Sequence, residues 1–143
     1  VFAWGDEYAP EGRTMANTWQ GQFPWENLLE DGFAGTSPVG SFPANGYGLS
    51  DVTGNVWEWT SDYFAMPSRS QRPCCAPSNP RVTDAAASVV PGETHPRRVI
   101  KGGSHLCAPN YCLRYRPAAR SAETIETSTG HIGFRGVVRS AGA

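Results

Sequence analysis

Two cysteines five positions apart form the most reactive group in this 143-residue sequence. Cys107 and Cys112 flank Pro109, which favours a tight bend that could bring both sulfur atoms together. Arg114 and Arg116 follow directly, and their positive charge is expected to favour thiolate over thiol. Two soft thiolates with no third obvious ligand suit Cu(I) better than zinc, which prefers four ligands.

The same cysteine pair is open to other chemical interpretations. A redox-active dithiol, a plain disulfide and two buried structural thiols all fit the spacing. No Cys-x-x-Cys at a helix start supports the redox-active dithiol. Gly102 and Gly103 precede the pair and would let the backbone approach a substrate closely. The residues alone leave these alternatives open.

For the other side chains of chemical interest, a structural role is favoured over a catalytic one. Cys74 and Cys75 are adjacent, and because neighbouring cysteines rarely form an unstrained disulfide, an inert loop pair is favoured. His105 and His131 could shuttle protons or line a groove, although a lone histidine is more often structural. Large aromatic residues are expected to fill the core, because a chain poor in helices needs them to bury enough area. These are Trp19, Tyr47, Trp57, Trp59 and Phe134.

Composition limits the class of protein. With 39% apolar residues, 17% charged residues and a net charge of -1, the chain is predicted to be one globular domain. Its mixed charges create no field that would attract nucleic acid or an anionic membrane. No apolar run approaches the roughly 18 residues of a transmembrane helix. The start at Val1 shows neither an initiator Met nor a signal pattern, which predicts missing upstream sequence.

Short strands and long loops must position the reactive residues. The 16 Gly and 12 Pro residues predict many turns. A turn is expected at residues 26–31, ended by Gly32, and strands at 56–60, 99–101 and 132–138. Residues 65–98 lack apolar periodicity, which predicts a variable surface excursion. The expected fold class is α+β.

Several short motifs run in order through nearly the whole chain. They are residues 16–21, 30–33, 45–49, 54–62, 102–104, the pair Cys107 and Cys112, and residues 114–116, 118–121 and 133–135. Together they resemble the formylglycine-generating enzyme, or sulfatase-modifying factor, family, in its carboxy-terminal portion. The broader superfamily shares the Gly-Asn-x-Trp-Glu-Trp and Gly-Phe-Arg signals without the activity. The two cysteines therefore single out the enzyme.

The resemblance implies an α+β fold related to C-type lectins, low in regular structure and stabilised by calcium. It implies that Cys107 and Cys112 bind Cu(I). The enzyme would use O2 to convert the cysteine of a Cys-x-Pro-x-Arg motif in an unfolded sulfatase to Cα-formylglycine. Ser104 is expected to line the oxygen pocket, with a turn-capping hydroxyl as an equally weighted alternative. The residues expected to bind substrate are Arg114, Arg120 and His131.

Two oxygen-rich groups align with the two calcium sites of the family. The first comprises Asn17, Thr18, Asp31 and Phe33, and the second comprises Asp51, Gly54, Val56 and Glu58. Side-chain and backbone oxygen atoms in each group would suit a hard cation. Neither spacing is that of an EF-hand, so ordinary turn chemistry is the alternative. Asp51 stands where relatives also have Asn, which adds negative charge.

Some relatives, especially those of the secretory pathway, have cysteines where this chain has Pro117 and Gly136. Their disulfides cannot form here, which predicts a prokaryotic, cytoplasmic enzyme. We expect a monomer that binds unfolded sulfatase polypeptide. A non-catalytic binding module with the same lectin-like fold is the second hypothesis, and a dithiol oxidoreductase is the third.

Overall fold

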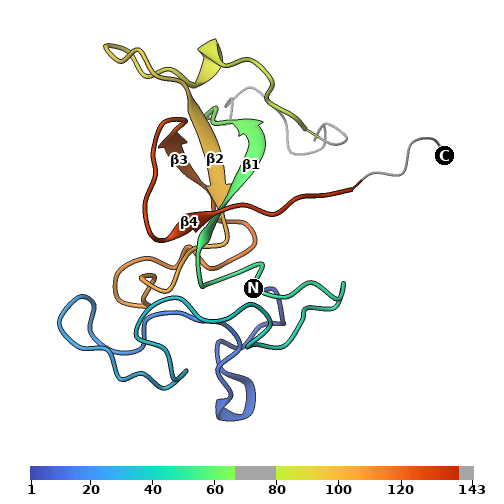
Figure 1. Cartoon of the computed structure of the whole chain (residues 1–143), viewed down its shortest axis with the longest axis vertical. Helices are drawn as coiled ribbons and strands as arrows, with labels where there is room; N and C mark the ends of the chain where they lie inside the picture. Colours follow the sequence, from blue (N-terminus) through green and yellow to red (C-terminus); the bar gives the residue numbers. More distant parts are fainter. Residues whose placement is uncertain (67–79, 139–143) are drawn as a thin grey trace.

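The computed structural model describes residues 1–66 and 80–138, and its strands form one sheet in the order β3-β2-β1-β4 (Figure 1). The strands are β1 (Trp57–Tyr63), β2 (Arg97–Lys101), β3 (Ser121–Thr124) and β4 (Ile132–Gly133). β2 is antiparallel to β1 and β3, whereas β4 runs parallel to β1. Two short 3-10 turns, η1 (Pro10–Gly12) and η3 (Ala86–Ser88), are the helical elements of the described residues. Within those residues, no helix has the length and apolar character needed to cross a membrane.

The strands expected at residues 56–60 and 99–101 are confirmed as β1 and β2, whereas β3 was not predicted. The closing strand is shorter than the expected 132–138. Only Ile132 and Gly133 pair with β1, and residues 134–138 lie outside the strands although β1 continues to Tyr63. β2 begins at Arg97, so the last two residues of the expected 65–98 excursion belong to the sheet. The turn is confirmed at its end, where the Gly32 amide donates to the Leu29 carbonyl over 2.9 Å.

Loops rather than helices pack against one end of the sheet. In Figure 1, residues 1–55 (blue to teal) lie below the strands, and residues 102–120 (orange) lie between them and the sheet. Backbone hydrogen bonds join these loop segments: the Gly54 amide donates to the Gly102 carbonyl over 2.8 Å, and the Trp19 amide donates to the Cys107 carbonyl over 3.0 Å. The loop that carries the cysteines is therefore held between the strands and the amino-terminal loops.

The core is small and includes one of the candidate cysteines. Its buried members are Trp57, Ile100, Cys107 and Tyr115. Trp19 and Trp59 are half-buried. The core assignment was wrong for Tyr47 and Phe134, which are 90% and 83% exposed. Tyr47 lies in a turn where its amide donates to the Asn45 side chain, and Phe134 follows the last paired residue of β4.

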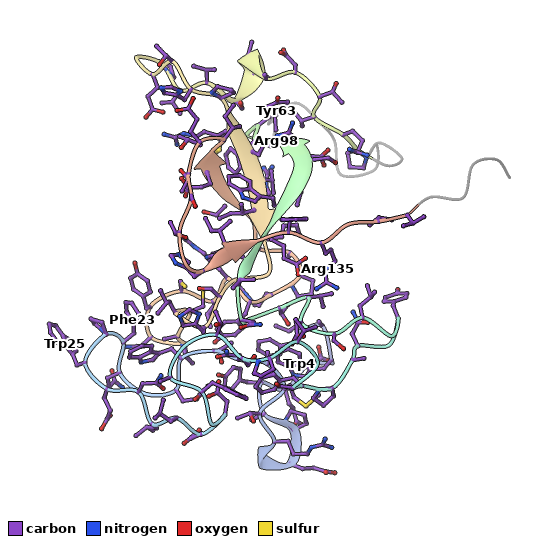
Figure 2. All side chains as sticks on the ribbon, viewed as in Figure 1. Trp4, Phe23, Trp25, Tyr63, Arg98 and Arg135 are labelled. Atoms are coloured by element: carbon purple, nitrogen blue, oxygen red, sulfur yellow. The ribbon has the colours of Figure 1, made fainter. Side chains whose placement is uncertain are left out.

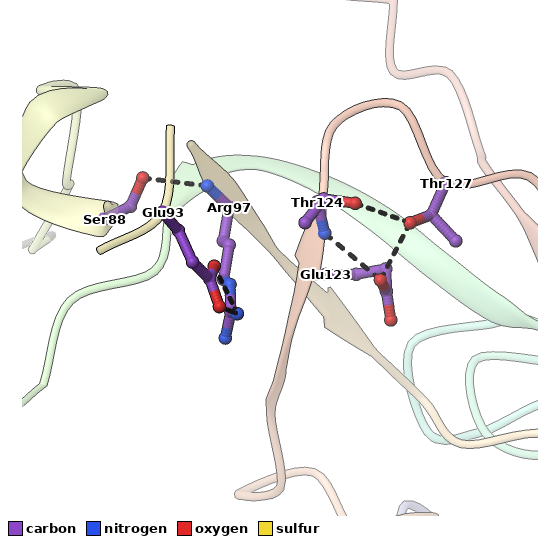
Figure 3. A network of polar contacts seen from close by, with 6 residues as sticks. All are labelled: Ser88, Glu93, Arg97, Glu123, Thr124 and Thr127. Atoms are coloured by element: carbon purple, nitrogen blue, oxygen red, sulfur yellow. Dashed lines mark hydrogen bonds and ion pairs between the residues drawn. The ribbon is translucent and has the colours of Figure 1, made fainter. Parts of the chain in front are cut away.

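Polar contacts close the end of the surface excursion onto β2 (Figure 3). The Ser88 hydroxyl accepts the Arg97 amide over 2.9 Å, and the Arg97 guanidinium pairs with Glu93 at 2.6 Å. The hydroxyl of Thr127, which follows β3, donates to the carboxylate of Glu123 on β3 over 2.8 Å. At the same end of the sheet, the Arg98 guanidinium lies 4.5 Å from the Tyr63 ring centroid (Figure 2). This end is therefore stabilised by side chains on three strands, opposite the loops that carry the cysteines.

Substitution of Ile100 by Ala should test where the core lies. Ile100 is 3% exposed, so the change should lower the free energy of unfolding by about 2–5 kcal/mol. Ile125→Ala is the matched control, because Ile125 is 45% exposed and its truncation should cost less than about 1 kcal/mol. Urea unfolding followed by tryptophan fluorescence measures both. Equal losses would contradict the assignment of the core.

Candidate functional site

The structure brings the two cysteine sulfur atoms into contact. Sγ of Cys112 lies 2.8 Å from Sγ of Cys107, and neither residue is in a disulfide. A single turn after Cys107 produces this contact, because the Ala108 carbonyl accepts the amides of both Tyr111 (3.1 Å) and Cys112 (2.9 Å). The bend predicted around Pro109 is therefore confirmed. Cys74 and Cys75 lie outside the described residues.

The two thiols differ in their environment. Cys107 is 2% exposed, whereas Cys112 is half-buried. Burial, followed by the hydrogen bond from Cys112, raises the pKa of Cys107 to about 12. Arg114 acts in the opposite direction on this pKa, but it is the smallest of the contributing causes. Arg114 therefore favours the thiolate of Cys107, as expected, but the loss of solvent around the buried sulfur outweighs this charge and raises the pKa.

Gly102 and Gly103 serve the packing of the chain on itself. Gly103 has a φ of +71°, and a Cβ there would lie 2.9 Å from the Tyr115 amide nitrogen. A Cβ on Gly102 would lie 2.9 Å from the Val52 carbonyl oxygen. Both contacts are with backbone atoms of this chain. The structure shows a close approach between the chain's own loops, and an approach to a substrate at these glycines stays a prediction.

Ser104 is buried at the base of the cysteine loop, with 1% exposure. Its carbonyl accepts the Cys107 amide over 2.9 Å, and its hydroxyl accepts the Leu106 amide over 3.3 Å. This is the turn-capping geometry that was the alternative interpretation of Ser104. A role in an oxygen pocket stays a prediction.

The three residues expected to bind substrate lie in different settings. The ring centroid of His131 is 6.5 Å from that of His105, so His131 lies beside the cysteine loop. Arg114 is exposed next to the cysteines. Arg120 donates to the Ala65 carbonyl over 2.8 Å and covers the Phe64 ring, just beyond β1. Arg120 therefore lies at the carboxyl end of β1. Trp57, which packs against Cys107, lies at the opposite end of that strand.

Hydrogen bonds join Thr18, Asp31 and Phe33, three members of the first oxygen-rich group. Asp31 accepts the Thr18 amide through Oδ2 (3.3 Å) and the Phe33 amide through Oδ1 (2.9 Å). Asn17 is 1% exposed, and its Oδ1 is buried without a hydrogen-bond partner. Gln20, which sequence reasoning missed, donates through Nε2 to both the Thr18 carbonyl and the Asp31 carboxylate. Unpaired buried oxygen is costly, so this group fits a hard cation.

The second group fits a cation less well. Asp51, Val56 and Glu58 line one open cavity of about 420 Å³. The Glu58 carboxylate already forms a bidentate pair with Arg135 at 2.6–3.0 Å (Arg135 is labelled in Figure 2). Asp51 accepts the Gly40 amide over 2.7 Å. No side-chain oxygen of this group is both buried and unpaired, and Arg135 supplies the positive charge that Glu58 needs.

Comparison with known proteins identifies the family. The sequence profile described as "Sulfatase-modifying factor enzyme 1-like domain" matches residues 1–141. This chain belongs to the sulfatase-modifying factor family. Within it, the chain is 53% identical to a formylglycine-generating enzyme of Mycobacterium tuberculosis and 47% identical to one of Streptomyces coelicolor, in each case over 94% of its own length.

The family assignment covers only part of those relatives. The chain spans 44% of the Mycobacterium protein and 39% of the Streptomyces protein. The solved structure of PvdO from Pseudomonas aeruginosa is also similar, with a TM-score of 0.59 and 26% identity over 94% of this chain and 42% of that one. The low helix content and curled sheet of this chain agree with the sulfatase-modifying factor fold.

Replacement of Gly103 by Ala should show how tightly the cysteine loop is packed. Gly48→Ala is the matched control: its φ of +74° is nearly the same, but a Cβ there meets nothing within 4 Å. Both variants carry the cost of a left-handed backbone, about 1 kcal/mol. Gly103→Ala adds the clash with Tyr115, a further 1–3 kcal/mol or so. Urea unfolding measures the difference, and equal costs would contradict the tight packing of Gly103 on Tyr115.

Proposed function

We propose that this chain is the cysteine-bearing part of a copper-dependent oxidase that converts the cysteine of a Cys-x-Pro-x-Arg motif in sulfatase precursors to Cα-formylglycine. The observation that carries the proposal is the contact between Sγ of Cys107 and Sγ of Cys112 at 2.8 Å, with one thiol buried and the other half-exposed. The similarity to proteins named formylglycine-generating enzyme supports it. The relation of the fold to C-type lectins stays a prediction.

The proposed reaction balances with one molecule of O2. The substrate carbon and its thiol give up two electrons as the side chain becomes an aldehyde and its sulfur leaves as hydrogen sulfide. A reducing thiol in solution supplies the other two electrons. With two protons, the four electrons convert one oxygen atom to water and place the other in the aldehyde. The reaction therefore consumes a reductant as well as O2.

The two cysteines fit the metal that this chemistry needs. Soft thiolates select Cu(I), and the sulfur atoms of Cys107 and Cys112 lie close enough together to hold one ion. Copper, when bound, supplies a one-electron route to O2, which the protein's own side chains lack. Cys107 and Cys112 would hold it.

The remaining residues of the chain position and protect the pair. Tyr115 and Trp57 pack around Cys107 and exclude water from it. Because Cys107 is buried and Cys112 is half-buried, Cys112 is the residue of the pair that a substrate thiol would approach. The Nδ1 of His105 lies 3.0 Å from the Asn55 carbonyl, so this nitrogen carries the proton and Nε2 can accept one. His131, beside it, would face the same approach path.

Turnover of a short peptide tests the proposal. Protein loaded with Cu(I) should convert a Cys-x-Pro-x-Arg peptide to the aldehyde in air with a thiol reductant, as seen by mass spectrometry. Cys107→Ser and Cys112→Ser should each lower the rate more than about 100-fold, because each would remove a metal ligand. Cys74→Ser combined with Cys75→Ser is the control, which should keep its activity. A folded, copper-loaded protein without product would defeat the catalytic claim.

A binding module without oxidase activity is the second candidate. The chain is 48% identical over 73 residues to a protein of Bos taurus named inactive C-alpha-formylglycine-generating enzyme 2. The same cysteine variants separate the two functions. If the chain is a binding module, Cys112→Ser should keep its affinity for the peptide, and the unsubstituted chain should show no Cu(I)-dependent turnover.

Calcium would stabilise the first oxygen-rich group. If calcium at about 100 times its dissociation constant occupies this group, the free energy of unfolding should rise by about 2.7 kcal/mol. A chelator should remove the increase, and Asn17→Ala should abolish it, because Asn17 Oδ1 is the buried oxygen without a partner. Asn27→Ala is the control, since the Asn27 side chain only accepts the Leu29 amide. If the midpoint temperature of thermal unfolding changes with neither calcium nor chelator, the first oxygen-rich group is not a calcium site.

A further inference from the structure

Asn55 contacts both the first oxygen-rich group and the cysteine loop. It is 7% exposed and has a φ of +57°, an uncommon backbone conformation for a residue with a side chain. Gly54, beside it, packs directly against the Asn17 carbonyl, where no Cβ would fit. The amide and side chain of Asn55 face Asn17 and Ser37, whereas its carbonyl faces His105.

Asn55 forms two hydrogen bonds with Asn17, a member of the oxygen-rich group, and two with Ser37. Its amide donates to the Asn17 carbonyl over 2.8 Å. Its Oδ1 accepts the Ser37 amide over 2.9 Å and lies 3.4 Å from Asn17 Nδ2, and its Nδ2 donates to the Ser37 carbonyl over 3.2 Å. Every polar atom of its side chain is thus used. The position of Asn55 depends on where Asn17 lies.

Toward the cysteine loop, Asn55 acts through one carbonyl. This carbonyl accepts both the amide of His105 (2.9 Å) and its Nδ1 (3.0 Å). His105 follows Ser104, whose carbonyl receives the Cys107 amide over 2.9 Å. A displacement of Asn55 therefore moves the base of the turn that brings the cysteines together.

We propose that Asn55 is a positioning residue whose side chain couples cation binding at Asn17, Thr18 and Asp31 to the closure of the loop carrying Cys107. The inference rests on the proposed cation site but needs neither copper nor turnover. A cation bound to Asn17 Oδ1 fixes the side-chain amide of Asn17 and, with it, the backbone carbonyl. The side-chain Nδ2 contacts Asn55 Oδ1, and the backbone carbonyl accepts the Asn55 amide. Occupancy of the cation site thereby favours the closed cysteine loop, in which Cys107 is buried.

The backbone offers one competing route. The Trp19 amide donates to the Cys107 carbonyl over 3.0 Å, so the segment after Thr18 also contacts the cysteine loop directly. Replacement of Asn55 by Gly separates the two routes. Glycine accepts the left-handed φ and keeps both backbone contacts, the amide bond to the Asn17 carbonyl and the carbonyl that receives His105, but it loses the side-chain bonds to Ser37 and Asn17. The Trp19 contact is unchanged in this variant.

The experiment measures alkylation of Cys107 by iodoacetamide, resolved by peptide mass spectrometry, with calcium or with chelator and without copper. In the unsubstituted chain, calcium should slow alkylation of Cys107 about tenfold, within the usual range for coupled sites. In Asn55→Gly, this ratio should fall to about one while calcium still binds, as measured by calorimetry. Asn45→Gly is the matched control, because Asn45 bonds only within its own exposed turn and should keep the full ratio.

Each outcome decides the proposal. A calcium effect that persists in Asn55→Gly assigns the coupling to the backbone contacts of Trp19 and residue 55 and overturns the role of the Asn55 side chain, while the proposed oxidase stands. No calcium binding by the unsubstituted chain overturns the inference and the cation site together, and peptide turnover then judges the oxidase separately. If Asn55→Gly does not fold, hydrogen exchange in the unsubstituted chain replaces it. Calcium should then slow hydrogen exchange of the Asn55 and His105 amides about tenfold, and the Tyr47 amide, as the control, should exchange at an unchanged rate. Equal exchange of the Asn55 and His105 amides with and without calcium would overturn the proposal.

Discussion

The pairing of backbone polar groups outside the sheet is the constraint on which this structure depends. The four strands contain seven, five, four and two residues, so most of the backbone cannot use a ladder of strand hydrogen bonds. Buried backbone groups must still be paired. Asparagine and aspartate side chains meet much of this need, as Asp31 does for Thr18 and Phe33 and as Asn55 does for Ser37. The loops are ordered because side chains replace the missing strands.

The same constraint explains what the sequence could predict. β1 and β2 were predictable because Val, Ile and Trp residues concentrate there. β3 was not, since its sequence Ser-Ala-Glu-Thr has no apolar alternation and is a strand only because it pairs with β2. Tyr47 and Phe134 were misplaced because aromatic type alone does not say whether a neighbouring segment covers the ring. That information lies in contacts between distant loops.

The candidate site follows the same division. The bend that joins Cys107 and Cys112 is local, and the residue types within it predict it. The high pKa of Cys107 is not local, because it arises from burial beneath residues distant in sequence, such as Trp57. Gln20, Asn55 and Arg135 were missed as site residues for a related reason. Each lies inside a motif that could be noticed, but its partner is set by the way the loops meet.

The short β4 strand also affects how the protein behaves at high concentration. Beyond Gly133, Phe134, Val137 and Val138 are 83%, 79% and 98% exposed in extended chain next to the sheet edge. Natural sheets protect such edges with free charges, but the one charge in residues 134–138, Arg135, is turned toward Glu58. A net charge of -1 adds little repulsion between molecules. We therefore expect this apolar segment to be one place where molecules in a concentrated sample associate while the core stays folded.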